Sequence, residues 1–271
     1  MTDVLNRLNQ VIDEQHAEKS AATRRQLVAG AAATLGGLGV LGLPGLAQAG
    51  HAEGHIDLDK IPKSDPQTIL NIAATAEILA TIVNTVGVET VALPDDGATK
   101  IAASARHELI HYNTLVQLGA KPLAKRIWVP DVVFSNSTAF LSTVEVGDQI
   151  FINAYLIAVT EFGRRGNGAL ARVAAEFMGV EAVHRAFARD LRGLLGNDRA
   201  YTKFDQDEKA PGAPTPPTRG FMRIETAVKQ LQGAGFGFDA EGSVKPGKFY
   251  DFATVSSRTP NPADVNNRAI D

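Results

Sequence analysis

The sequence contains no cysteine, and only 6% of its 271 residues are aromatic. Without cysteine the chain has no structural disulfides and no thiolate metal sites, an absence that also fits an exported protein. No basic run is interleaved with aromatic residues and the formal net charge is -3, so the composition excludes a typical nucleic-acid surface. The remaining composition, 44% hydrophobic and 21% charged, is ordinary for a globular protein with one sizeable core.

The N-terminus has the pattern of an export signal. Arg24 and Arg25 precede a weakly apolar run over 27–43 that five glycines dilute, and Ala-Gln-Ala at 47–49 is a small-x-small cleavage site. The segment resembles a twin-arginine signal, whose export machinery carries proteins that are already folded. We therefore expect a signal peptide over 1–49 and a periplasmic or extracellular protein with no permanent membrane span. The alternative is a membrane anchor, for which this run is short.

Apolar residues recur at helical spacing in four segments, over about 65–86, 97–119, 135–162 and 168–196. Glycines at 87, 119 and 196 are expected to end three of these helices. The connection between the second and third segments is the longest of the three, which predicts a crossover along the length of a four-helix bundle.

The pattern therefore predicts an all-α four-helix bundle over residues 64–200. A flexible lead-in over 50–63 is expected to precede it, and a largely irregular, Pro/Gly-rich extension over 201–271 to follow it. The sequence is compatible with a homo-oligomer.

Two copies of a Glu-x-x-His pattern are the sequence feature most informative about function. Glu108 and His111 lie three residues apart, as do Glu181 and His184, so each pair shares one face of its helix. Both pairs fall on the apolar face of their segment, and a buried carboxylate costs several kcal/mol or more unless a cation or a proton compensates it. The pattern therefore predicts a metal site, and the alternative is two surface Glu–His pairs.

A site for two metal ions needs one further carboxylate from each of the other two helices. Glu77 lies on the inward face of the first helix, as far before the turn near residue 93 as Glu108 lies after it. On the third helix, Asp148 is the residue at the height of Glu181, and Glu145 is the reserve. Glu161 is excluded, because it lies roughly 20 Å further along the helix and on another side.

These residues resemble a known family. The segments that carry the resemblance to the ferritin-like domain proteins related to the plant desiccation-related protein are 70–77 (Leu-Asn-Ile-Ala-Ala-Thr-Ala-Glu), 106–111, 118–122 and 181–184. The resemblance covers about residues 64–200, with shorter similarities in the tail, and it implies a metal-binding bundle in a protein often exported by the twin-arginine route. The family usually has Glu where this chain has Asp148, so the resemblance implies a second metal site that is weaker or differently coordinated.

Three functions are compatible with these observations. In the first, two iron or manganese ions are bridged by Glu108 and Glu181, one site is completed by Glu77 and His111 and the other by Asp148 and His184, and the centre oxidises Fe(II) or reduces oxygen or peroxide. In the second, the chain is a stress or desiccation protein with a structural metal or none. Iron storage in a cage ranks last, because the proline-rich tail does not resemble a compact fifth helix.

The twin arginines give the first prediction. Replacing Arg24 and Arg25 together with Lys should leave a folded precursor in the cytoplasm, because the export machinery recognises the arginine pair. Cell fractionation measures this, and the intact mass of the exported wild type should place its N-terminus at Gly50. Unchanged export of the double variant would refute the twin-arginine route.

Overall fold

The computed structural model describes residues 63–198 and 220–265. The chain divides into two units, 1–61 and 62–271, and all described residues belong to the second. The expected signal peptide, nearly all of the lead-in, and the proline-rich part of the extension lie outside the described residues. Within the described residues the protein is mostly helical, which confirms the predicted helical class.

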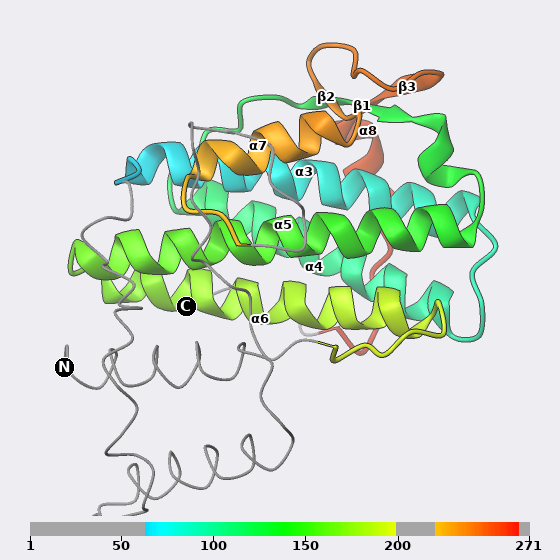
Figure 1. Cartoon of the computed structure of the whole chain (residues 1–271), viewed down its shortest axis with the longest axis horizontal. Helices are drawn as coiled ribbons and strands as arrows, with labels where there is room; N and C mark the ends of the chain where they lie inside the picture. The colour runs from blue at the N-terminus through cyan, green and yellow to red at the C-terminus, as the bar shows by residue number, and fades with distance from the viewer. Residues whose placement is uncertain (1–62, 199–219, 266–271) are drawn as a thin grey trace, which may run out of the picture. The chain divides into compact units, whose positions relative to one another are not determined.

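Four long helices lie side by side, as Figure 1 shows: α3 (Pro66–Thr90), α4 (Gly97–Gln117), α5 (Ser137–Arg164) and α6 (Gly168–Asp190). The two most extensive contacts join α3 to α4 and α5 to α6, which are neighbours in sequence. Contacts of α3 with α5, and of α4 with α6, hold the two pairs together. This arrangement turns one face of each helix toward a common interior.

Helix α3 is the most completely buried of the four. Asp65 caps its N-terminus by accepting a 2.8 Å hydrogen bond from the backbone N–H of Thr68, and Pro66 occupies the first position, where it removes no helical hydrogen bond. By length and composition α3 could cross a bilayer, but 89% of its most apolar window is buried inside the protein. A core helix has the same composition.

Two of the predicted helix ends are wrong. Helix α3 continues past Gly87, where a Cβ atom would lie 2.2 Å from the ring of Phe140 on α5, so this glycine permits close packing and does not end the helix. Helix α6 ends at Asp190, before Gly196. The chain leaves it through Gly193, whose φ of 71° is the left-handed conformation that glycine adopts without strain.

The crossover and the C-terminal extension contain more regular structure than expected. Strand β1 (Arg126–Pro130) and a 3-10 turn (Asp131–Phe134) lie in the crossover. The extension contains the short helices α7 (Ile224–Gly233) and α8 (Phe252–Ser256) and the strands β2 (Gly237–Phe238) and β3 (Gly247–Asp251). The three strands form an antiparallel sheet with β1 in the middle, pairing Ile127 with both Phe238 and Tyr250.

Glycines in the extension let its backbone approach Trp128, the only tryptophan in the chain. A Cβ atom on Gly242 or Gly247 would lie 2.7 Å from the indole ring. The indole N–H donates a 3.2 Å hydrogen bond to the carbonyl oxygen of Val244. The extension is therefore fastened to the crossover, and α7 packs against α5 and α3 (Figure 1).

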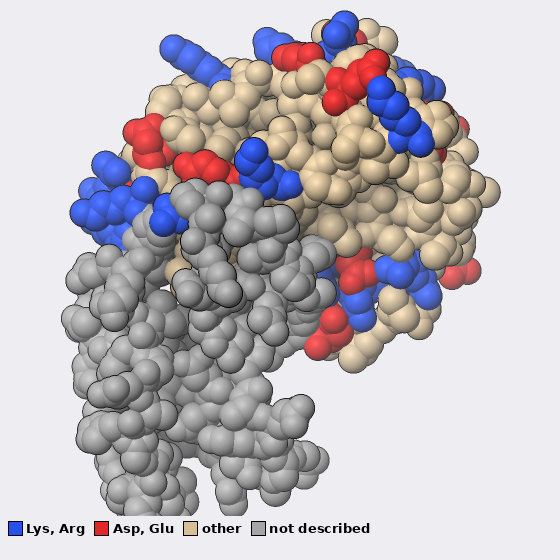
Figure 2. Space-filling model, turned by 45° about the horizontal axis from the view of Figure 1, so that its top comes forward, with Lys and Arg blue, Asp and Glu red and all other residues tan. Residues whose placement is uncertain are grey.

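Acidic and basic side chains are intermixed on the face of the molecule in Figure 2. The helices of the described residues also carry ion pairs four residues apart, including Lys100 with Asp96 at 2.9 Å and Arg172 with Glu176 at 2.8 Å. Exposed pairs of this kind contribute little to stability, so the fold depends mainly on its buried interior.

The contact at Gly87 gives a second prediction. Gly87→Ala should destabilise the protein by about 1–3 kcal/mol, because the methyl group forces Phe140 or the helix backbone to move. Gly163→Ala is the matched control, since a Cβ there meets nothing within 4 Å and alanine is the better helix former. Denaturant melts should show a lower midpoint for Gly87→Ala and an equal or higher midpoint for Gly163→Ala. Equal melting midpoints for the wild type and Gly87→Ala would contradict the close contact.

Candidate metal centre

Six acidic and histidine side chains meet in the interior between the four long helices. Each helix contributes a carboxylate, and α4 and α6 each add an imidazole: Glu77, Glu108, His111, Asp148, Glu181 and His184. None is more than 4% exposed. They form two overlapping groups, in each of which the potential ligand atoms lie within 4.8 Å of one another: Glu77, Glu108, His111 and Glu181 in one, and Glu108, Asp148, Glu181 and His184 in the other. The structure thus brings together all six residues selected from the sequence.

Both imidazoles turn their Nδ1 atoms toward the carboxylates. His111 Nδ1 lies 3.2 Å from Glu181 Oε1 and 3.6 Å from an oxygen of both Glu77 and Glu108. His184 Nδ1 lies 3.1 Å from Glu108 Oε1 and 3.5 Å from Glu181 Oε2. Each histidine therefore faces carboxylates from its own helix and from another helix.

Helix geometry explains this convergence. The spacing of three places Glu108 beside His111 and Glu181 beside His184 on the inward faces of α4 and α6. Glu77 meets Glu108 because α3 and α4 run antiparallel from a turn that lies about equally far from both residues. The same relation through the turn between α5 and α6 brings Asp148 to the height of Glu181.

Much of the polar surface in the cluster has no hydrogen-bond partner in the structure. Seven buried atoms are in this state: Glu77 Oε2, Glu108 Oε2, His111 Nδ1, Asp148 Oδ2, both oxygens of Glu181, and His184 Nδ1. Several of them lie within ion-pair distance of each other without hydrogen-bond geometry. A buried polar atom without a partner costs about 1–3 kcal/mol, more if charged, and a bound cation removes that cost.

The environment shifts the pKa values of the acids in opposite directions. Burial raises the pKa of Glu77 well above its usual value, and the charges of Glu108 and Glu181 reinforce this against the opposing effect of His111. Burial also raises the pKa of Asp148, again with Glu181 adding to it. Burial acts on Glu108 too, but His184 and His111 outweigh it and hold the pKa of that carboxyl well below its usual range.

The two histidines of the cluster favour the protonated form. Burial alone would lower the pKa of His111 and of His184, but the facing carboxylates outweigh it and raise both pKa values well above the usual range. Glu77 has the largest such effect on His111, and Glu108 on His184. Without metal, protons on these groups therefore balance part of the buried negative charge.

Three further residues contact the cluster. The Tyr155 hydroxyl donates a short hydrogen bond to Glu77 Oε1, the Asn84 amide donates to Glu108 Oε1 at 3.3 Å, and His107 Nδ1 lies 3.0 Å from His184 Nε2. Asn84 and Tyr155 lie seven residues, two helical turns, after Glu77 and Asp148, so their position on the inward face was readable from the spacing. His107 precedes Glu108 directly and carried no comparable signal.

Helix α5 has two further acids: Glu145, which was the reserve for Asp148, and Glu161, which was excluded. Both lie outside the cluster. Glu145 pairs with Arg189 at 2.5 Å and with Arg192, and it belongs to neither of the two ligand groups. Glu161 is buried but pairs with Arg165 at 2.8 Å and Arg164 at 3.2 Å. Both carboxylates have guanidinium partners, unlike those of the cluster.

Comparison with known proteins returns no match: no family model fits the chain, and neither a curated protein nor a solved structure is similar to it. The site must therefore be interpreted from its own chemistry. Buried carboxylates and imidazoles with unpartnered atoms could hold metal ions, and oxygen and nitrogen ligands of this kind suit iron and manganese among others.

The shifted pKa values give a third prediction, for the metal-free protein. Above about pH 6.5 the unfolded chain has released protons that His111, His184, Glu77 and Asp148 retain in the folded state, so stability should fall as pH rises. Each retained proton lowers the free energy of unfolding by about 1.4 kcal/mol per pH unit, or roughly 2–4 °C in Tm. Thermal melts between pH 7 and 9 in excess chelator measure this slope.

The control for this prediction is the double variant Glu77→Gln with Asp148→Asn, whose amides do not titrate. Its melting temperature should depend less on pH than that of the wild type. A metal-free wild type whose stability rises between pH 7 and 9 would contradict the protonated cluster.

Proposed function

We propose that this chain is an exported ferritin-like protein whose four long helices form a four-helix bundle around two divalent metal ions, iron or manganese. The observation that carries the proposal is the single buried cluster of four carboxylates and two imidazoles, one carboxylate from each long helix, with seven atoms that lack hydrogen-bond partners. Export rests on residues 24–49, which lie outside the described residues.

The division of ligands follows from the two groups. Glu108 and Glu181 belong to both, which supports a bridging role for each carboxylate. Glu77 and His111 belong to one group alone and would complete the first site. Asp148 and His184 belong to the other and would complete the second. Four carboxylates can then neutralise the charge of two divalent cations.

The metals would supply one-electron redox chemistry toward Fe(II), dioxygen or peroxide. The chain's own residues hold the ligands in place and keep bulk water out of the interior. The Tyr155 hydroxyl fixes one oxygen of Glu77, and the Asn84 amide fixes one oxygen of Glu108. Such contacts to ligands commonly change metal affinity 10–100-fold when they are removed.

His107 has a similar positioning role for His184. When Nδ1 of neutral His184 binds a metal, its Nε2 carries the proton, so His107 Nδ1 must accept the 3.0 Å hydrogen bond. Burial and the neighbouring His184 lower the pKa of His107 to about 4, which keeps its ring neutral and able to accept. The ring of His111 is held differently, by stacking on Phe177 at 4.0 Å between centroids.

Metal content in three variants gives a fourth prediction. Asp148→Ala should reduce the bound metal from about two ions toward one per chain, because it removes the only carboxylate from α5 in the cluster. Asp148→Glu should retain or improve binding. Glu145→Ala is the matched control on the same helix and should leave the metal count unchanged, since its partners are arginines.

Elemental analysis of the purified variants measures these counts, with Glu161→Ala as a second control. Loss of metal in Glu161→Ala or Glu145→Ala with full occupancy in Asp148→Ala would show that the wrong carboxylate has been assigned. Wild-type protein from the exported pool that contains no iron or manganese would refute the metal proposal. Oxygen or peroxide consumption on adding Fe(II), if equal in wild type and Asp148→Ala, would favour a structural metal.

A further inference from the structure

A small pocket lies between α3 and α5, and its lining includes Asp148 of the candidate metal centre. Its volume is about 30 Å³, which is room for two or so water-sized molecules and too little for a larger organic substrate. The α5 side includes Thr143, Val144, Gly147, Asp148 and Phe151, and the α3 side Leu79, Ala80, Val83 and Asn84.

The inner end of the pocket is polar. Asp148 is a proposed metal ligand, and Asn84 donates to the proposed bridging ligand Glu108. Asp148 Oδ2 and Asn84 Oδ1 are buried and have no hydrogen-bond partner in the structure. Two of the residues that line the pocket therefore carry unpartnered oxygens beside the second proposed metal site.

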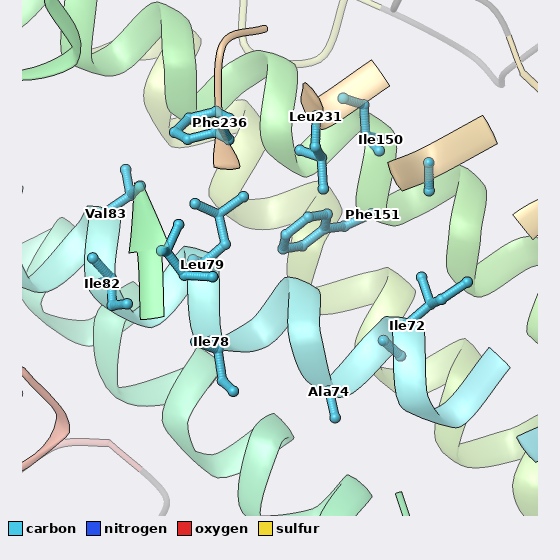
Figure 3. Close-up of a cluster of buried hydrophobic side chains, with 14 of the residues drawn as sticks. Ile72, Ala74, Ile78, Leu79, Ile82, Val83, Ile150, Phe151, Leu231 and Phe236 are labelled. Atoms are coloured by element: carbon cyan, nitrogen blue, oxygen red, sulfur yellow. The ribbon is translucent and has the colours of Figure 1, made fainter. Parts of the chain in front are cut away.

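The outer wall comes from the C-terminal extension. Leu231 of α7 and Phe236, which follows α7, complete the lining. Figure 3 shows both side chains directed toward Leu79, Val83 and Phe151 from the two long helices. Phe236 is 5% exposed, so the extension narrows the pocket from outside.

We propose that this pocket is the route by which a small oxidant, dioxygen or hydrogen peroxide, reaches the metal centre, with the C-terminal extension as its outer wall. The inference rests on the proposed metal centre and adds the substrate's size class and direction of approach. The largely apolar lining disfavours a hydrated divalent cation, which would lose water ligands without gaining others. A neutral molecule of two heavy atoms has no such cost and fits the volume.

Gly147 offers a test that does not touch a ligand. It lines the pocket, and a Cβ built on it would meet nothing within 4 Å, so a side chain can begin there in free space. Gly179 on α6 is the matched control: it is also a helical glycine with nothing within 4 Å, and it is exposed and outside the pocket lining. Both substitutions to Leu improve helix propensity.

The probe is nitric oxide, a neutral molecule of two heavy atoms that binds ferrous ions at an open coordination position. Wild type, Gly147→Leu, Gly179→Leu and Phe236→Ala are loaded with Fe(II) in the absence of oxygen, and iron per chain is measured first. Nitric oxide binding is then followed by its absorption band in stopped flow. We expect equal iron in all four, nitric oxide binding at least tenfold slower in Gly147→Leu, unchanged in Gly179→Leu, and faster in Phe236→Ala.

The possible failures are distinguishable. Equal nitric oxide rates in all four iron-loaded proteins would overturn the route and leave the metal centre intact. Iron-loaded wild type that binds no nitric oxide would also overturn it, because the centre would then admit no external ligand. Wild type that binds no iron would refute the proposed function itself, and the route with it.

Discussion

The burial of four carboxylates in one helical interior is the constraint on which the rest of the structure depends. Glu77, Glu108, Asp148 and Glu181 are each at most 3% exposed, and among the six residues of the cluster only His111 and His184 can offset their charge. A cluster of like charges at low dielectric is unfavourable unless protons or cations compensate it. The fold therefore accepts a cost that an apolar interior would avoid, and this cost is the strongest indication that the cluster has a function.

The sequence predicted the site best where the helical spacing of residues and their distance from a turn indicated the same side chains. The spacing of three in both Glu-x-x-His pairs, and the equal distances of Glu77 and Glu108 from one turn, depend on helix geometry alone, and the structure brings these side chains together. The helix ends were less predictable. Glycine commonly ends a helix, so Gly87 was predicted to end α3. Its role is instead set by the Phe140 ring, which comes from another helix and leaves no signal in the sequence around Gly87.

The extension was least predictable, because its structure depends on distant partners. Strand β1 pairs with strands more than 100 residues later, β2 has only two residues, and the five residues of β3 do not alternate between apolar and polar. The residues that contact the cluster were hard to predict for a related reason. Asn84 and Tyr155 lie on inward faces, but a buried Asn or Tyr is common in cores, so spacing alone does not separate a ligand-supporting residue from an ordinary one.

The position of Trp128 has a consequence for spectroscopy. The indole lies in the middle strand of the small sheet, against the glycines of the extension and apart from the six residues of the cluster. As the chain's only tryptophan, it makes intrinsic emission a report on one place, the attachment of the extension to the crossover. The same extension carries Leu231 and Phe236, so a change in that emission would mark the moment at which the outer wall of the pocket detaches from the helices.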